Sequence, residues 1–503
     1  MDIVLDIELG HDRGQGFGTL FEATDAAGRA VCGAGFADVY NSLYRSDRFT
    51  LQFYVRHPRD TAGFTLNPLP RSTTDRGVYA FDFDGRLHAK SASGPVHPHG
   101  WFAVDRDPRD AGSCRAVRAW DDANEDWRND ADLDASLMRV GDGKMRVAGR
   151  LLRFQNSRAE WGGQVILETP AEGFYHHFYY AIGHLVFFHK TGKSIRLLAC
   201  PWEPGSERPA DVAGAVTLQL EHDREFPFAM GQWNGEVIVS TNLGGSYGFD
   251  GTQWRVLRKQ GSEGRDESYQ LYSTLPYEDR LLLAHYPSGH LWEHDGASGR
   301  ELHGWPPRPD GAAAEAREAQ TTMIYAGDLW VGVWPWGELW RYDRAEQAWE
   351  PAGRLFDEPA LTDDLNHPYE ENSSDPAARN HWGQRITSLV PVGGSLMAAT
   401  SAKFTWPEET RPDFISHTSW EQYGRILQIS VPGCLSVPVT WSEGNTRLRF
   451  RTEESRMSIE QDGVELDSTA ISGEAESGLR DAAVRCGEGV FGRFGGASIG
   501  FGR

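Results

Sequence analysis

The sequence lacks any apolar run of about 18 residues, the length that a membrane-crossing helix needs, so we expect nothing to span a membrane. Its first residues, MDIVLDIELGHDRG, alternate like a strand and lack the basic segment and cleavage site of a signal peptide. We therefore expect a cytoplasmic chain, or a mature secreted or periplasmic form whose signal has been removed. Cysteine is also scarce: the five in 503 residues are scattered, which does not fit a disulfide framework.

Basic residues are also scarce relative to acidic ones. Lysine and arginine number 50 against 72 aspartates and glutamates, so the formal net charge is −22. Such a balance argues against nucleic acid and against an anionic membrane surface as partners. An anionic ligand would need basic residues concentrated in one place.

Glycine and tryptophan, in contrast, are plentiful, at 56 and 18, and this composition favours short strands and tight turns over long helices. Three segments repeat a pattern of apolar strand, glycine turn, aromatic strand, aspartate turn and further strand: 234–257, 278–305 and 326–353. The landmarks recur at intervals of 44 and 48 residues for glycine and 45 and 48 for aspartate: Gly245, Gly289, Gly337, Asp250, Asp295 and Asp343.

A period near 45 residues built from hairpins is typical of a β-propeller with one four-stranded blade per repeat. Weaker copies at 77–90, 145–156 and 423–430, with the opening hairpin, bring the total to about seven blades. We predict an all-β fold, a propeller spanning 73–432. The terminal strands, 1–72 and 433–503, are expected to close the ring or to form a small β addition.

One hairpin, GFYHHFYYAIGHLVFFHKTGKSIRLLACPW (173–202), carries four histidines, three tyrosines, an arginine and a cysteine. Alignment with the third repeat predicts that 180–189 is an innermost strand, and that the residues before it lie at the mouth of the central channel. A turn near 190–193 would place His184 opposite Cys200, close enough for both to reach one metal ion. Arg196 would lie opposite Phe187 or Phe188.

Arg196 stands among apolar residues and needs an anionic partner, which could be a protein carboxylate or the carboxylate of a ligand. The motif His97-Pro98-His99 holds two imidazoles on a constrained turn, and surface histidines are the alternative reading. His381 and Trp382 precede a strand, where the indole could stack on the apolar face of a sugar ring.

With His97 and His99 on an early blade loop, and Tyr180 and Arg196 sixteen residues apart on a following hairpin, the chain resembles the β-propeller ulvan lyases and related polysaccharide lyases. This resemblance implies cleavage of a uronate-containing, possibly sulfated polysaccharide by β-elimination. Histidine and tyrosine would then act as base and acid, and Arg196 would neutralise the uronate. It also implies a structural zinc ion, for which His184, Cys200 and His222 are the available ligands.

The resemblance leaves a geometric problem, because Tyr180 lies roughly 20 Å along straight strands from the partner of Arg196. Tyr175, Tyr179 or His177 could take its place beside the arginine. A glycoside hydrolase would need paired carboxylates, and no convincing pair is visible. A non-catalytic carbohydrate-binding propeller is the third possibility.

Overall fold

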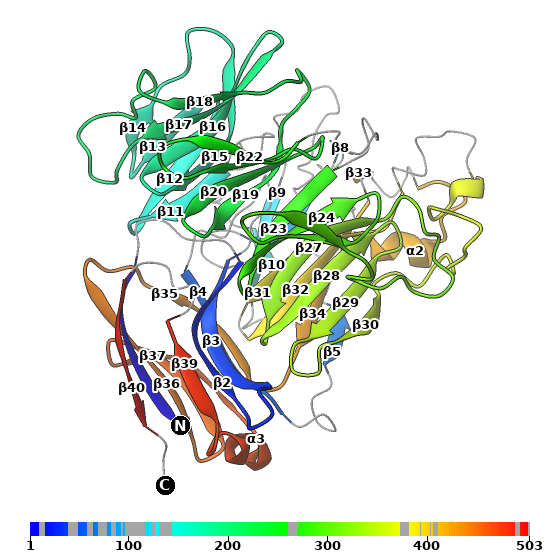
Figure 1. Ribbon diagram of the computed structural model, residues 1–503. Coiled ribbons are helices and arrows are strands. Elements are labelled where there is room, and N and C mark those ends of the chain that lie inside the picture. Colours follow the sequence, from blue (N-terminus) through cyan, green and yellow to red (C-terminus); the bar gives the residue numbers. More distant parts are fainter. Residues whose placement is uncertain are drawn as a thin grey trace.

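The computed structural model describes the chain in seventeen stretches: residues 1–9, 16–38, 49–57, 64–68, 78–81, 87–91, 94–95, 116–121, 126–129, 143–259, 270–372, 382–392, 394–402, 404–405, 411–423, 425–487 and 493–500. Nearly all regular structure in them is β-strand (Figure 1). The helical elements described are short: η3 (Glu370–Asn372), α2 (His417–Gln422) and α3 (Gly473–Gly478). No described helix is long and apolar enough to cross a membrane.

Seven four-stranded antiparallel sheets form in the described part of the chain, and we number them blades 1–7 in chain order. The first three blades consist of β6 (Val78–Phe81), β7 (Leu87–Ser91), β9 (Ala116–Asp121) and β10 (Asp126–Asn129); β11 (Gly143–Val147), β12 (Arg150–Gln155), β13 (Arg158–Trp161) and β14 (Gln164–Leu167); and β15 (Phe174–Ala181), β16 (His184–Thr191), β17 (Ser194–Pro201) and β18 (Val216–Gln219).

The next three blades consist of β19 (Pro227–Trp233), β20 (Glu236–Thr241), β21 (Ser246–Phe249) and β22 (Trp254–Arg258); β23 (Gln270–Tyr277), β24 (Arg280–Tyr286), β25 (Leu291–His294) and β26 (Gly299–Leu302); and β27 (Glu318–Tyr325), β28 (Asp328–Trp334), β29 (Glu338–Asp343) and β30 (Ala348–Arg354). The first strand of each blade is the innermost, because these strands contact one another between blades in the order β11, β15, β19, β23, β27, blade 7, β6.

Blade 7 is assembled from both ends of the propeller. Its inner three strands are β31 (Arg385–Val392), β32 (Ser395–Ser401) and β34 (Ile426–Ser430), and its outer strand is β5 (Thr65–Pro68) from the N-terminal region. Leu66 pairs with Ile429, so strands far apart in sequence close the ring. A short ribbon of β8 (Gly94–Pro95) and β33 (Phe404–Thr405) also joins distant segments.

The remaining terminal strands form a β-sandwich beside the blades (Figure 1). One sheet contains β38 (Val464–Ala470), β37 (Arg456–Gln461), β36 (Asn445–Glu453), β1 (Asp2–Glu8) and β40 (Arg493–Gly500); the other contains β35 (Cys434–Val439), β4 (Phe49–Val55), β3 (Ala30–Asp38), β2 (Gly16–Thr24) and β39 (Ala483–Cys486). Alternate residues of β1 are buried, and rings such as Phe21 and Phe450 meet at 5.1 Å between the sheets. The predicted propeller of about seven blades is confirmed, and the terminal strands both close the ring and add a β unit.

The repeated aspartates each close the turn between the third and fourth strands of a blade. Asp250 Oδ1 accepts the backbone N–H groups of Thr252 and Gln253, both at 2.8 Å. Asp295 and Asp343 accept the N–H groups two and three residues ahead in the same way. Aspartate recurs there because a short carboxylate satisfies turn donors that no strand reaches.

The prediction that 180–189 is an innermost strand was wrong. The innermost strand of blade 3 is β15, and β16 is the second strand. The repeats used for the alignment begin at the second strand of each blade, so one strand before each of them went unrecognised.

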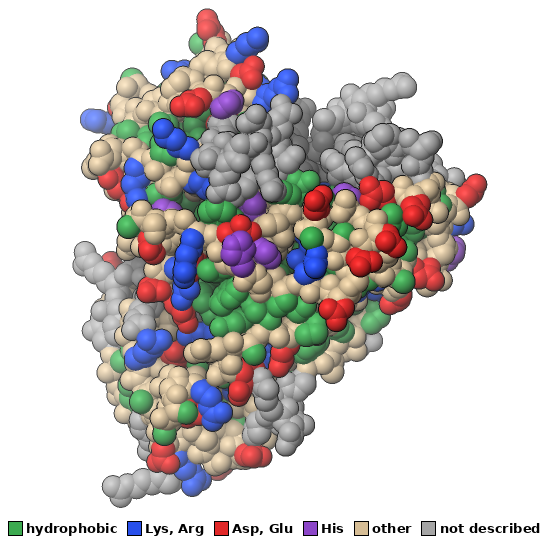
Figure 2. All heavy atoms as spheres, turned by 45° about the vertical axis from the view of Figure 1, so that its right-hand side comes forward, with side chains coloured by type: hydrophobic (Ala, Val, Ile, Leu, Met, Phe, Trp, Pro, Cys, Tyr) green, Lys and Arg blue, Asp and Glu red, His purple; other side chains and the backbone are tan. Residues whose placement is uncertain are grey.

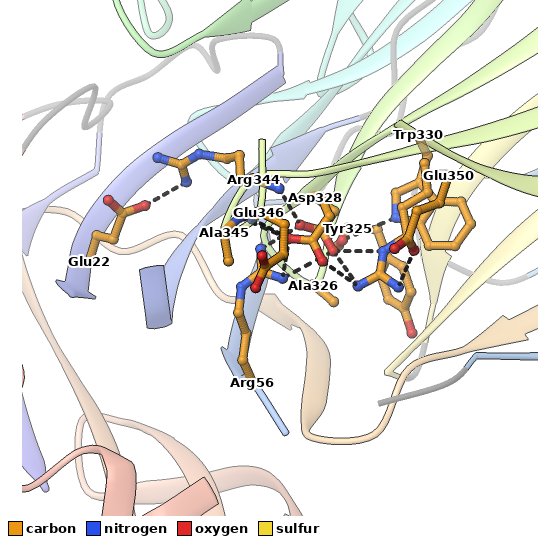
Figure 3. A network of polar contacts seen from close by, with 12 residues as sticks. Glu22, Arg56, Tyr325, Ala326, Asp328, Trp330, Arg344, Ala345, Glu346 and Glu350 are labelled. Atoms are coloured by element: carbon orange, nitrogen blue, oxygen red, sulfur yellow. Dashed lines mark hydrogen bonds and ion pairs between the residues drawn. The ribbon is translucent and has the colours of Figure 1, made fainter. Parts of the chain in front are cut away.

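A buried ion-pair network joins the sandwich to blade 6 (Figure 3). Asp328, at the start of β28, receives Arg56 from the end of β4 and Arg341 from β29, whose Nε lies 2.8 Å from Oδ2. Arg344 reaches Glu22 of β2, which also accepts Arg485 at 2.8 Å. Because these carboxylates are almost fully buried, their pairing fixes how the two units dock.

Candidate functional site

The hairpin singled out in the sequence, 173–202, forms β15, β16 and β17, three of the four strands of blade 3. The register in which these strands pair decides which side chains meet. Tyr175 of β15 pairs with His189 of β16, which pairs with Arg196 of β17. Residues opposite one another in adjacent strands point to the same face, so these three side chains form one row. We call Tyr175, His189 and Arg196 the blade 3 row.

His189 is fixed in one tautomer by its hydrogen bonds. Arg196 Nη2 donates to His189 Nδ1 at 2.9 Å, so the ring proton lies on Nε2. That nitrogen lies 2.9 Å from the carbonyl oxygen of Glu172, to which it donates. Both ring nitrogens are therefore occupied, and the imidazole positions the guanidinium. Tyr175 packs its ring 4.9 Å from the same imidazole.

Arg196 forms no ion pair with a carboxylate among the described residues, and its guanidinium is half-buried. Lys190 lies at the same end of the blade and donates to the backbone carbonyl of Asp223 at 3.3 Å. Two cations thus stand at one blade end without a described carboxylate partner, in a chain of net charge −22. Acidic side chains are spread over much of the face drawn in Figure 2, so an anionic ligand would depend on cations such as these to approach.

A histidine pair lies beside the row on the opposite face of the blade. His176 Nδ1 is 2.5 Å from His177 Nδ1, so one ring donates to the other. Burial, together with the positive charge of Lys190 nearby, lowers the pKa of His176 to about 3. At neutral pH His176 is therefore an uncharged imidazole. The ring of Phe174, which is 47% exposed, lies 5.3 Å from it and leaves an aromatic surface open at the blade end.

His177 owes its position to a β-bulge, where His177 and Phe178 together oppose one residue of β16. Its φ of +54° lies in the left-handed region, and its side chain is 3% exposed. The innermost strands of the next three blades carry a bulge at the equivalent point, each with one extra residue: Phe228, Tyr272 and Gln320. We call His177, Phe228, Tyr272 and Gln320 the bulge row.

The bulge row runs across several blades at the end where the innermost strands begin. The ring of His177 lies 6.0 Å from Phe226, which lies 5.3 Å from Phe228, which lies 4.9 Å from Tyr272. Burial and a hydrogen bond with Glu318 raise the pKa of Tyr272 well above its usual value, although Arg385 acts in the opposite direction. The bulge row therefore places one buried aromatic or polar side chain near the start of the innermost strand in each of blades 3–6.

A cavity of about 770 Å³ lies instead between the sandwich and blade 6. Its arginines already have partners: Arg56 and Arg341 bind Asp328, and Arg29 binds Asp25. With these charges neutralised from within, the lining supports the docking of two units better than it supports the binding of an anion.

Several predicted site residues are not where the sequence placed them. His184 pairs with Pro201, and Cys200 pairs with Leu185, so the predicted register was off by one residue. Such a slip moves a side chain to the other face. The turn is tighter than expected, with Thr191 opposite Ser194, and Arg196 therefore faces His189 and neither phenylalanine.

The predicted metal ligands consequently diverge. Cys200 lies in the apolar core that faces blade 2, where burial raises the pKa of its thiol to about 12. His184 packs 5.0 Å from Phe249 of the next blade and bonds the carbonyl of Ile182. His222 is exposed in the loop after β18. These three residues do not form a metal-binding group in the described structure.

Tyr180 is 1% exposed, and its hydroxyl donates to Glu203 at 3.2 Å. It pairs with Leu185, four residues along β16 from His189, or about 13 Å from the row. Tyr175 is the tyrosine that shares the row with Arg196. Trp382 is in the core, with its ring 5.3 Å from Trp420, so it offers no face to a sugar. His97, His99 and His381 lie outside the described residues.

The sequence reasoning named His177 but gave no role to His176, His189 or Lys190, and it missed the other members of the bulge row. Extending each repeat by one strand towards the N-terminus would have aligned β15, β19, β23 and β27 and made the bulge row recognisable. The hydrogen bond between His189 and Arg196 depends on the register, which the turn length sets.

No protein-family model matches the chain, and no curated protein does. Solved structures with some likeness include BamB from Moraxella catarrhalis, at 10% identity and a TM-score of 0.34 over 66% of this chain and 88% of that one. The PQQ-bound aldose sugar dehydrogenase from Streptomyces coelicolor has 12% identity and a TM-score of 0.30 over 74% and 99%. A quinohemoprotein alcohol dehydrogenase from Pseudomonas putida HK5 has 10% identity and a TM-score of 0.35 over 66% and 67%. Likenesses this low carry no argument about function.

Proposed function

We propose that the protein acts on a uronate-containing polysaccharide, which it binds at the end of blade 3 and cleaves by β-elimination. The observation that carries the proposal is Arg196, held by Nδ1 of His189 and without an ion pair to any described carboxylate. A guanidinium placed in this way suits the carboxylate of a sugar acid, which it can bind through two parallel hydrogen bonds.

The surroundings of Arg196 fit an acidic sugar in two further respects. Lys190, at the same blade end but on the opposite face from Arg196, supplies a second cation for a neighbouring carboxylate or sulfate. The exposed ring of Phe174, on the same face as Lys190, offers an apolar surface to a pyranose, as aromatic side chains do in many ligand sites. Concentrating positive charge at one blade end also allows a polyanion to approach a chain whose net charge is −22.

In the proposed reaction Arg196 neutralises the uronate carboxylate, which makes the C5 proton more acidic and stabilises the enolate-like charge that forms. Tyr175 protonates O4 as the C4–O bond breaks, since its phenol carries a proton at neutral pH and lies in the same row as Arg196. The base that takes the C5 proton is His97 or His99, as the resemblance to ulvan lyases implies.

A non-catalytic carbohydrate-binding propeller is the second candidate. It is favoured by the absence of an evident base beside Arg196 among the described residues. His189 has both ring nitrogens engaged, and a pKa of about 3 makes His176 a poor base at neutral pH.

The test is incubation with ulvan, other uronate polysaccharides and neutral glycans, followed by ultraviolet absorbance and by assay of reducing ends. A lyase yields unsaturated uronates that absorb. Arg196→Gln keeps an amide near His189 but removes the charge, and we expect at least a hundredfold loss of absorbance. Arg208→Gln, an exposed arginine of the same blade, is the matched control and should retain full activity.

Other outcomes distinguish the alternatives. Reducing ends without absorbance would identify a hydrolase, and binding of uronate polymers without either product would identify a binding module. Full activity of the Arg196→Gln variant would remove this arginine from the mechanism.

A further inference from the structure

We propose that blade 5 carries a binding site for a divalent transition-metal ion, formed by His290, Glu301 and His303. This site is separate from the blade 3 row, and it does not depend on the proposed function. Among the described residues, this is the one group of three histidine, cysteine or acidic side chains whose ligand atoms come close enough together.

The register of one hairpin brings the three side chains to the same face. Leu291 of β25 pairs with Leu302 of β26, which leaves His290 and His303 facing each other just beyond the strand ends. Glu301 pairs with Trp292, two residues on from His290. Since side chains alternate along a strand, Glu301 and His303 share a face with His290.

The distances fit a site that needs only a small adjustment. Glu301 Oε1 lies 2.9 Å from His290 Nδ1, and the two imidazole rings are 5.8 Å apart and nearly perpendicular. One ligand atom from each residue lies within 4.8 Å of the other two. Tetrahedral ligands stand roughly 3.4 Å apart around an ion about 2.1 Å from each, and the exposed His303 has the freedom to make that movement.

The hairpin that carries the ligands is well fixed. The Asp295 turn joins β25 to β26, and the backbone N–H of His290 donates to Ser288 Oγ at 3.2 Å. Glu301 and His290 are about one-fifth exposed, so an ion would be partly shielded yet open to a water molecule as fourth ligand. The nearby cation Arg317 is bound to Glu338, which removes most of its repulsion.

Two imidazoles and a carboxylate are the ligands that Zn²⁺, Co²⁺ and Fe²⁺ accept, whereas Ca²⁺ and Mg²⁺ prefer oxygen alone. Isothermal titration of the chelator-treated full-length protein with Zn²⁺ should reveal one site with a dissociation constant in the micromolar range or lower. Co²⁺ should give the visible absorption of a tetrahedral centre.

His303→Ala should weaken Zn²⁺ binding at least tenfold and abolish the Co²⁺ spectrum, and Glu301→Gln should weaken binding similarly. His303 is exposed, so its removal leaves the fold intact. His417→Ala, an exposed histidine of α2 that lies 3.9 Å from Glu421, is the matched control and should bind as the unaltered protein does. Absence of a saturable site, or equal affinity in the His303→Ala variant, would overturn the proposal.

Discussion

At the scale of single residues, the reactive side chains of the hairpin 173–202 lie on two different faces of blade 3. Tyr175, His189 and Arg196 lie on one, and the histidine pair lies on the other. The cysteine and Tyr180 belong to packing, since both are almost fully buried among apolar neighbours. Residue types that look equally reactive in sequence therefore have different roles once their faces are known.

Substitutions of Cys200 test whether this residue serves packing alone. We expect Cys200→Ser to lower the free energy of unfolding by about 1–3 kcal/mol, because a buried hydroxyl would replace a weakly polar thiol. Cys200→Ala, which leaves a small cavity but no hydroxyl, separates the two contributions. Urea unfolding measures the change in the free energy of unfolding for both variants. If a chelator destabilised the unaltered protein but not the Cys200→Ser variant, the cysteine would have to be a metal ligand after all.

At the scale of elements, the bulge near the start of the innermost strand in each of blades 3–6 does more than bend that strand. It turns one side chain per blade towards a common end of the ring, as for His177 and Tyr272. The start of β15 also depends on Gly173, where a Cβ would stand 2.0 Å from the carbonyl oxygen of Lys190. Close approach of the two strands there places Phe174 and Lys190 side by side.

Gly173→Ala should therefore destabilise the protein by about 2 kcal/mol or more and weaken ligand binding at blade 3, since β15 must move away from β16. Gly192→Ala in the same hairpin is the control: φ is +59° there, but a Cβ meets nothing within 4 Å. Gly192→Ala should lower the free energy of unfolding by only about 1 kcal/mol, the cost of holding alanine in a left-handed backbone conformation. Thermal unfolding and ligand titration measure both effects, and equal losses in the two variants would contradict the close-approach argument.

At the scale of the whole molecule, Asp328 joins the sandwich to the propeller. Burial by itself would raise the pKa of Asp328, but the charges and hydrogen bonds of Arg56 and Arg341 outweigh it, so the pKa is lowered. A carboxyl whose folded pKa is depressed stabilises the fold at pH values above its unfolded pKa of about 3.9. That contribution is lost as the pH falls through the folded pKa.

Asp328→Asn should cost about 3 kcal/mol or more near pH 7, because two buried arginines lose their counter-charge. The difference from the unaltered protein should begin to shrink below about pH 4, where the aspartate becomes protonated in the unfolded chain, and should shrink further as the pH falls towards the lower folded pKa. Asp2→Asn breaks a more exposed pair with Arg449 and should cost less than about 1 kcal/mol. Urea unfolding across pH 3–8 checks this, and a pH-independent difference would contradict the linkage.

The sequence by itself determined the repeat, and with it the class of fold. Local backbone geometry requires glycine or aspartate at particular turn positions, such as Asp250 and Asp295. The spacing of the turns could therefore be recognised without knowing which strands are neighbours. Apolar strands between them then had to pack as blades. The N-terminal and C-terminal strands could be recognised as β, although their split between ring closure and sandwich depends on long-range pairing such as that of Leu66 with Ile429.

Only the tertiary structure decided which side chains meet. A register shift of one residue separated His184 from Cys200 and brought His189 to Arg196, and no local pattern reports such a shift. The same holds for His290 and His303, which a single hairpin register places face to face. Turn chemistry acts within a few residues and shows in the local sequence, whereas convergence of side chains depends on the register in which whole strands pair.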